Sequence, residues 1–112
     1  MIYEARVATV IPGREDIFIS RTSTEYFPMV KKHGGKPIGI YQTVFGNSEE
    51  VFYVLGWDDL TQRDKVLQSM RKDADYTEMS DRWTKAPSIS NLSSRIVKQP
   101  SEPFLSSAAG AP

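Results

Sequence analysis

Two charged residues near the N-terminus, Glu4 and Arg6, are the first candidates for chemistry in this chain of 112 residues. They stand two apart in the run IYEARVATV, whose β-branched and aromatic residues predict a strand, so both side chains share one face. One interpretation is a charged pair inside a pocket or a dimer interface, with Arg6 binding an anionic ligand. The other is a buried structural ion pair that fixes the register of the sheet. The sequence leaves both interpretations open.

His33 is the only histidine and therefore the first candidate for general acid–base catalysis. It follows Lys31 and Lys32 and directly precedes Gly34-Gly35, a pattern typical of the C-terminal end of a helix. We therefore expect His33 to stabilise a helix end. No Gly-x-Ser-x-Gly motif accompanies it, so a serine hydrolase triad is not predicted.

Aromatic side chains on the predicted hairpin and late helices form a third candidate group. Tyr53 and Trp57 stand four apart on a predicted strand and so share a face. These rings could line an apolar pocket between sheet and helices, with phenol hydroxyls orienting a flat ligand, or they could fill a small core. The candidate ligand-binding residues are Arg6, Tyr41, Tyr53, Trp57 and Trp83, and Tyr76 belongs to the same aromatic set.

Metal and cofactor chemistry has little support in the sequence. The pairs Asp58-Asp59 and Asp73-Ala74-Asp75 could suggest a hard cation, but both stand where helices are expected to begin, so capping accounts for them. The chain has no cysteine and a single histidine, too few ligands for a structural transition-metal site. It also lacks a glycine fingerprint for dinucleotides and a phosphate loop. We expect no metal and no cofactor.

Composition argues against nucleic acid and membrane as partners. Fourteen basic and fourteen acidic residues give a net charge of zero, which offers no electrostatic basis for binding either. The strand EVFYVLGW, preceded by glutamate, lacks the Lys/Arg-Gly-aromatic pattern of the RNA-recognition motif. No apolar run is long enough to span a bilayer, and the N-terminus does not resemble a secretory signal. We therefore expect a cytoplasmic protein.

Hydrophobic periodicity predicts four strands and three helical segments. The strands are expected at residues 2–10, 37–45, 50–57 and, with the weakest pattern, 89–97. Helices are expected from Arg14 to His33, from Asp58 or Asp59 to Asp73, and over a short segment that carries Tyr76, Met79 and Trp83. The apolar residues of the second helix share one side of it; they are Leu60, Val66, Leu67 and Met70. Pro28 lies inside the first helix, so a kink or break is expected there.

This order of elements predicts an α+β fold, a four-stranded antiparallel sheet with the helices on one face. Residues 1–99 are expected to form the domain, and residues 100–112 a tail rich in Pro, Ser and Ala. Phe104 and Leu105 are the only large apolar residues of that tail. We expect both to be largely buried, against a partner subunit rather than their own core.

The two central strands are apolar on both faces. Val51, Tyr53, Leu55 and Trp57 alternate with Phe52, Val54 and Gly56, and Ile38 and Ile40 oppose Tyr41 and Phe45. Because the helices cover only one face, a second copy of the sheet is expected to cover the other, which predicts a symmetric homodimer. A lysine at Ile40, if that position faces the partner, is expected to disrupt it.

The segments MIYEARVATVIPGR, PMVKKHGGKPIGIYQTVFG, NSEEVFYVLGWDDLTQRD and DADYTEM resemble the NIPSNAP family over about residues 1–83. The resemblance implies a ferredoxin-like βαββαβ fold in which two sheets form a dimeric α/β barrel. Ala5 stands where family members usually have leucine, which thins the core there. Relatives in the wider superfamily include cofactor-independent monooxygenases, dehydratases and haem-handling enzymes, so the resemblance does not specify a reaction.

Two hypotheses for function follow. In the first, each subunit of a homodimer binds a small apolar or aromatic ligand between sheet and helices. It would then act as a ligand-binding protein or as a cofactor-independent, monooxygenase-like enzyme in which Trp57, Tyr53 and Arg6 position an aromatic or enol-like substrate. In the second, the chain is a non-catalytic interaction module whose main feature is the dimer. A closed cavity between sheet and helices would favour the first, and a filled core the second.

Overall fold

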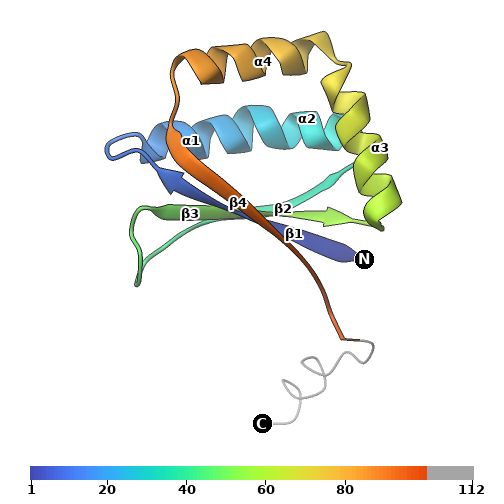
Figure 1. Ribbon diagram of the computed structural model, residues 1–112, viewed down its shortest axis with the longest axis horizontal. Helices are drawn as coiled ribbons and strands as arrows, with labels where there is room; N and C mark the ends of the chain where they lie inside the picture. The colour runs from blue at the N-terminus through green and yellow to red at the C-terminus, as the bar shows by residue number, and fades with distance from the viewer. Residues whose placement is uncertain (101–112) are drawn as a thin grey trace.

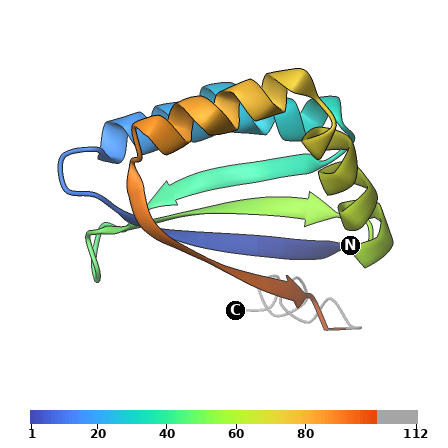
Figure 2. The same cartoon turned by 45° about the horizontal axis from the view of Figure 1, so that its top comes forward.

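The computed structural model describes residues 1–100, and the expectation for Phe104 and Leu105 lies outside them. The elements are β1 (Ile2–Val10), α1 (Glu15–Arg21), a π-helical turn η1 (Thr22–Tyr26), α2 (Phe27–Lys32), β2 (Lys36–Gln42), β3 (Glu50–Trp57), α3 (Leu60–Arg71), α4 (Ala74–Lys85) and β4 (Ile89–Lys98). The strands form one antiparallel sheet in the order β2-β3-β1-β4. The helices lie on one side of it (Figures 1 and 2). The predicted α+β, ferredoxin-like fold is thus confirmed.

The register of the central strands places the candidate charged residues beside the aromatic ones. In the antiparallel pair of β1 and β3, Glu4 is opposite Leu55 and Arg6 is opposite Tyr53. Directly opposite residues point to the same face, so all four side chains face the helices. Val51, Tyr53, Leu55 and Trp57 are buried there, as the alternation predicted.

The first helix is interrupted before Pro28, as expected. The interruption is the π-helical turn η1, and Pro28 is the second residue of α2, in the first turn of the helix, where proline is tolerated. Just before it, the hydroxyls of Thr22, Ser23 and Thr24 donate to the carbonyls of Phe18, Ile19 and Ser20 at 2.6–2.9 Å. Such side-chain bonds compete with the backbone ladder and bend helices. The turn directs Tyr26 toward the sheet, where it is buried.

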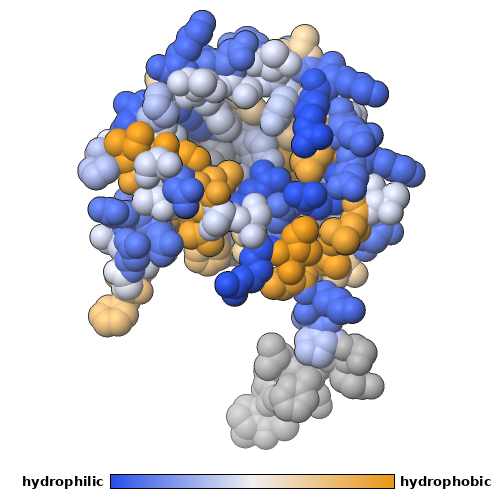
Figure 3. All heavy atoms as spheres, in the orientation of Figure 1, coloured by the Kyte–Doolittle hydropathy of each residue, from blue (hydrophilic) through white to orange (hydrophobic). Residues whose placement is uncertain are grey.

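The hairpin between β2 and β3 differs from the prediction in length. The strand expected to reach residue 45 ends at Gln42, because the Thr43 hydroxyl donates to the Glu50 carbonyl at 2.7 Å in place of a backbone bond. Val44 and Phe45 therefore lie in the loop and are 99% exposed. The loop projects on the side of the sheet away from the helices (Figures 1 and 2), and an apolar tip projects at the lower left of Figure 3.

A register shift between Pro37 and Gly39 moves Ile38 to the face of β2 opposite the one expected, whereas Ile40 and Tyr41 still lie on opposite faces. Ile40 is opposite Tyr53 and packs against the core, on the helix side. Ile38 is instead near Gly56 on the other face, so the two isoleucines do not share a face. The lysine substitution at Ile40 was expected to disrupt a dimer only if that position faces the partner, and Ile40 does not lie on the open face.

The face of the sheet opposite the helices is apolar and uncovered. Phe52 and Val54 are half-buried there, and the Tyr41 ring stacks on Phe52 with centroids 5.0 Å apart. We define the open face by the apolar residues Tyr3, Ala5, Val7, Ile38, Tyr41, Phe52, Val54 and Val97. Its existence confirms that the helices of one chain cover only one side of the sheet.

The remaining helices begin where the sequence predicted. The side chains of Asp59 and Asp73 accept hydrogen bonds from the backbone N–H groups of Gln62 and Asp75, so they are the N-caps of α3 and α4. Leu60 was expected on the buried side of α3 but is 56% exposed, because it is the first residue of the helix. Within residues 1–100, no helix is long and apolar enough to cross a bilayer.

Candidate functional site

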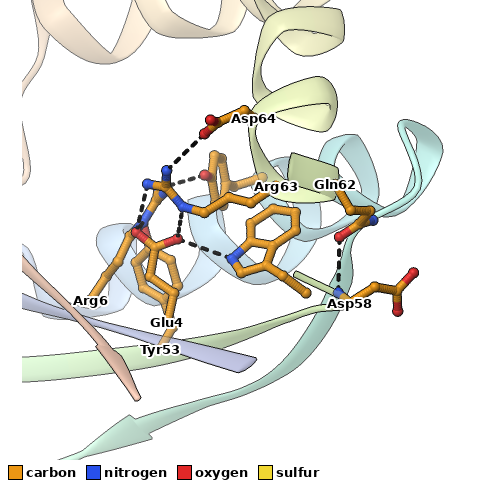
Figure 4. Close-up of polar contacts among 9 residues, drawn as sticks. Glu4, Arg6, Tyr53, Asp58, Gln62, Arg63 and Asp64 are labelled. Atoms are coloured by element: carbon orange, nitrogen blue, oxygen red, sulfur yellow. Dashed lines mark hydrogen bonds and ion pairs between the residues drawn. The ribbon is translucent and has the colours of Figure 1, made fainter. Parts of the chain in front are cut away.

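The Glu4 carboxylate is the centre of a buried polar cluster beneath the helices (Figure 4). Oε1 accepts from Arg63 Nε at 2.8 Å and from the Trp57 indole N–H at 3.1 Å. Oε2 accepts from Arg6 Nε at 3.1 Å and from Arg63 Nη2 at 3.2 Å. Glu4 is fully buried, yet four charge-assisted or indole donors satisfy both oxygens.

These contacts determine the ionisation of Glu4. Burial alone would raise the pKa of its carboxyl, but the hydrogen bonds from Arg63 and the charge of Arg6 outweigh burial and lower the pKa to about 2. The carboxylate is therefore charged at neutral pH and fully engaged, so it is not free to accept a proton from a substrate.

Acid is expected to destabilise the protein through Glu4. Its pKa is 4.5 in the reference state and about 2 when folded. A depressed folded-state pKa gives stability that is present above pH 4.5 and is lost as the pH falls toward 2, on the order of 3 kcal/mol here. Urea unfolding across this range should show that loss for the wild type.

The Glu4→Gln variant is the matched control for this titration, because it lacks the ionisable group but leaves all other acids in place. The stability difference between wild type and variant should shrink as the pH falls from 4.5 to 2. A difference that stays constant with pH would contradict the role assigned to Glu4.

Arg6 extends from this cluster toward the aromatic residues. Its Nη1 donates to the Tyr26 hydroxyl at 2.6 Å and to the Tyr53 hydroxyl at 3.4 Å. The guanidinium carbon lies 5.7 Å and 5.9 Å from the centroids of the same two rings. Burial raises the pKa of both phenols despite the opposing effect of Arg6. Tyr26 and Tyr53 therefore keep their protons at neutral pH.

A cavity of about 450 Å³ lies between the sheet and the helices, above these hydroxyls. Packed aromatic rings form part of its wall: the Tyr26 and Tyr53 rings meet edge to face at 5.7 Å, and Phe18 lies 6.3 Å from Tyr53. The full lining is Arg6, Phe18, Arg21, Thr22, Tyr26, Tyr53, Tyr76, Met79, Ser80, Trp83, Thr84, Pro87, Ser88, Ile89 and Leu92. Aromatic and aliphatic side chains thus share this lining with two arginines and with serine and threonine hydroxyls, a mixture that can both bury and orient a small molecule.

Trp83 of α4 forms part of the wall on the helix side. Its indole N–H donates to Glu25 Oε2 at 3.3 Å, and its ring lies 6.4 Å from that of Tyr26. Arg82 pairs with Glu25 at 2.6 Å, and Arg21 lies over the Trp83 ring at 5.9 Å. The hydrogen bond from Arg82 lowers the pKa of Glu25, so this pair is charged at neutral pH. These contacts join α4 to η1 across the cavity.

Three of the five predicted ligand-binding residues line this cavity. Arg6, Tyr53 and Trp83 meet there from β1, β3 and α4. Trp57 lies in the core, fully buried and bonded to Glu4, so it supports the cluster without facing the cavity. Tyr41 lies on the open face, on the other side of the sheet. It therefore has no access to this cavity.

Tyr26 is the principal cavity residue that the sequence did not single out. It lies within the helix predicted from Arg14 to His33, and its hydroxyl gave no separate signal. Arg63 was missed for a similar reason, since an arginine on an amphipathic helix is usually exposed. Both are brought to β1 by tertiary packing, which no local pattern encodes.

His33 is at the C-terminal end of α2, as predicted. Its ring lies 2.6 Å from the Ser69 hydroxyl and 2.8 Å from an Asp73 carboxylate oxygen, which also accepts from Lys32 at 2.8 Å. Hydrogen bonds from Lys32 and His33 lower the pKa of Asp73. The cluster ties the end of α2 to the junction of α3 and α4. It borders neither of the hollows described here.

A second hollow, of about 830 Å³, runs along the outside of α4. It is lined by exposed residues such as Glu78, Asp81 and Lys85 and contains no buried polar group. Within residues 1–100, no three imidazole or carboxylate side chains are grouped closely enough to hold a metal ion. The cavity beside Arg6 is therefore the better candidate site.

Comparisons with known proteins agree with this architecture. The sequence profile of the NIPSNAP family matches residues 3–101. An uncharacterised NIPSNAP domain protein from Burkholderia xenovorans is 16% identical, with 90% of this chain and 96% of that chain covered and a TM-score of 0.80. A NIPSNAP family protein from Agrobacterium tumefaciens is 19% identical, with 89% and 93% covered and a TM-score of 0.78.

A more distant structural neighbour is described as a putative antibiotic biosynthesis monooxygenase from Nitrosomonas europaea. It is 11% identical, with 88% of this chain and 98% of that chain covered and a TM-score of 0.62. At this identity the likeness concerns the fold alone. None of the curated proteins matches the sequence significantly.

Proposed function

Because the chain belongs to the NIPSNAP family, whose profile spans nearly all of it, we propose that it is a homodimeric protein that binds a small, flat, apolar molecule in the cavity between its sheet and α4. The observation that carries this proposal is the cavity itself. Its volume of about 450 Å³ falls in the range of small-molecule sites, and aromatic rings line it on two sides. A space that served only as core would be filled by side chains.

The lining favours binding and orientation of the ligand over proton abstraction. Glu4 is fully engaged by two arginines, and burial keeps the protons on Tyr26 and Tyr53. Cofactor-independent turnover, as in a monooxygenase-like reaction, would then depend on the reactivity of the bound molecule. Its charge could be stabilised by Arg6, but the side chains of the described lining would not remove its proton.

The open face supports the second part of the proposal, association with another copy. Four strands about 4.8 Å apart and about 27 Å long give a footprint of about 500 Å². The side chains that project from the sheet add to this flat area, as does the exposed hairpin tip of Val44 and Phe45 on the same side. The total area is then close to the roughly 800 Å² per partner of a stable interface. The charged residues of this face, Lys36, Glu50 and Arg95, include both signs, and its remaining area is largely apolar. A second copy of the same sheet can cover that apolar area, so it is the partner that we propose. This face is also the feature that favours the alternative function, an interaction module without turnover.

Ligand binding is expected to raise the melting temperature of the wild-type protein. At a ligand concentration of about 100 times Kd, the gain is about 2.7 kcal/mol, which corresponds to roughly 10 °C for a domain of this size. A thermal-shift series with 2-naphthoate, 2-naphthamide and related two-ring compounds makes this measurement. If no compound of the series raises the melting temperature, the proposal fails.

Two variants of α4 test whether the ligand that raises the melting temperature binds in the cavity. Ser80 lines the cavity, so Ser80→Trp should fill it and abolish the shift. Asp81 is exposed and belongs to the hollow on the outside of the same helix. Asp81→Trp adds the same side chain there and should leave the shift unchanged. An equal shift in wild type and Ser80→Trp would place binding elsewhere.

A further inference from the structure

The floor of the cavity presents hydrogen-bond donors from two phenols and a guanidinium. Arg6 Nη1 donates to the hydroxyl oxygens of Tyr26 and Tyr53, at 2.6 Å and 3.4 Å. Each hydroxyl that accepts in this way still has its own proton to donate. Within residues 1–100, neither proton has a protein acceptor, although both rings are buried. A ligand that satisfies these donors must bring an acceptor oxygen.

The charged residues next to the two phenols also favour a ligand with an acceptor oxygen. One carboxylate, Glu4, is shared between Arg6 and Arg63, so this buried cluster carries a net charge of +1. Arg63 also approaches Asp64 at 3.5 Å, but that carboxylate is 66% exposed and is largely screened by solvent. The cavity lining includes Arg6 and Arg21 and, among the described residues, no Asp or Glu, but the Glu25 carboxylate behind Trp83 interacts with Arg21 and offsets its charge. The potential inside the cavity therefore favours an anion.

The rest of the lining restricts the shape and charge of that anion. The rings of Phe18, Tyr26, Tyr53 and Trp83 surround the space above the hydroxyls, so the body of the ligand is apolar and flat. A single excess positive charge matches one negative charge. A phosphate dianion would need further cations or a row of backbone N–H groups. The lining comes from strands and helices except for Pro87 and Ser88, and Pro87 has no N–H to offer.

From this arrangement we infer that the ligand is a flat, apolar monoanion, a carboxylate or an enolate, whose charged oxygen accepts hydrogen bonds from Tyr26, Tyr53 and Arg6. The inference rests on the proposed function, since it names the chemical class of ligand for the same cavity. Tyr26 and Tyr53 are then specificity-determining residues, because their hydroxyls donate directional hydrogen bonds to the ligand oxygen beside the positive charge of Arg6. The raised pKa values of both phenols support this role, because they remain donors at neutral pH.

Isothermal titration with two isosteric probes tests the charge requirement. The probes are 2-naphthoate and 2-naphthamide, which share the two-ring body and differ in the charged oxygen. Wild-type protein is expected to bind the acid at least 10-fold more tightly than the amide. Equal affinities would overturn the inference and leave the proposed cavity function intact. Absence of binding by either probe would contradict the proposed function, and the inference with it.

The Tyr26→Phe and Tyr53→Phe variants test the assigned donors. Each keeps its ring and removes one hydroxyl, so the affinity for the amide should change by less than about 3-fold. The preference for the acid should fall by about 5-fold or more in each variant, because a charge-assisted hydrogen bond is lost. Thr43→Val, which removes a hydroxyl from the distant hairpin loop, is the control and should keep the full preference. If both phenylalanine variants also keep it, the assignment of the phenols is wrong.

Discussion

Replacing Glu4 with alanine is expected to reduce the free energy of unfolding by about 4 kcal/mol. The substitution leaves the guanidinium groups of Arg6 and Arg63 without their shared carboxylate, and it removes the acceptor of the Trp57 indole N–H. Removing one partner of a buried ion pair typically costs about 3–5 kcal/mol, since the remaining charge is desolvated and unpaired. Urea unfolding at pH 7, followed by circular dichroism, measures the change.

Glu78 provides the matched control for this experiment. Its side chain is 66% exposed and pairs with Arg82 one helical turn away, an arrangement worth about 0.5 kcal/mol or less. Glu78→Ala should therefore change the free energy of unfolding about eight times less than Glu4→Ala. A loss below about 1 kcal/mol in Glu4→Ala would show that the two arginines do not depend on this carboxylate.

Replacing Val54 with lysine is expected to convert the proposed dimer into a monomer. Val54 lies on the open face, opposite Ala5 in β1 and Gly39 in β2, near the middle of the surface that a second copy would cover. A lysine there would be buried without a partner in the dimer but solvated in the monomer. The dimer dissociation constant should rise by about 100-fold or more, and sedimentation velocity at micromolar concentration measures it.

Ile17 offers the control for the dimer. It lies on α1, in the helix layer on the other side of the sheet, and it is 38% exposed. Ile17→Lys introduces the same charge and should leave the association state unchanged. A wild-type protein that sediments as a monomer at micromolar concentration would contradict the proposed dimer.

The sequence predicted the strands and helix starts well because these depend on local chemistry. Residues 2–10 and 50–57 were predicted as strands, and both boundaries are confirmed, since β-branched and aromatic runs end at Gly, Pro or Asp. Capping was predicted for Asp58 or Asp59 and for the group Asp73-Ala74-Asp75, and the caps in the structure are Asp59 and Asp73. The bulge in β2 was not predicted, because the face of Ile38 depends on how that strand pairs with β3.

The candidate site was predicted in part. Arg6 and Tyr53 were expected to share a pocket, and the structure places them opposite each other on neighbouring strands. Of the two interpretations of Glu4 and Arg6, the structure shows the buried ion pair, and the binding of an anion by Arg6 stays a prediction. Glu4 is a buried structural ion, whereas Arg6 pairs with it and also faces the cavity. Tyr26 could not be recognised, since only the π-helical turn before Pro28 directs it to Arg6.

The most direct test of the cavity as a binding site uses the two tryptophans of the chain. The Trp83 indole N–H lies at the cavity wall and donates to Glu25, whereas that of Trp57 lies in the core and donates to Glu4. Their two indole signals in a ¹H–¹⁵N correlation spectrum, assigned with a Trp83→Phe variant, are followed during titration with 2-naphthoate. We expect a saturable shift of the Trp83 signal and a much smaller one for Trp57. Saturable shifts confined to backbone signals of the open face, with both indole signals unmoved, would contradict the account.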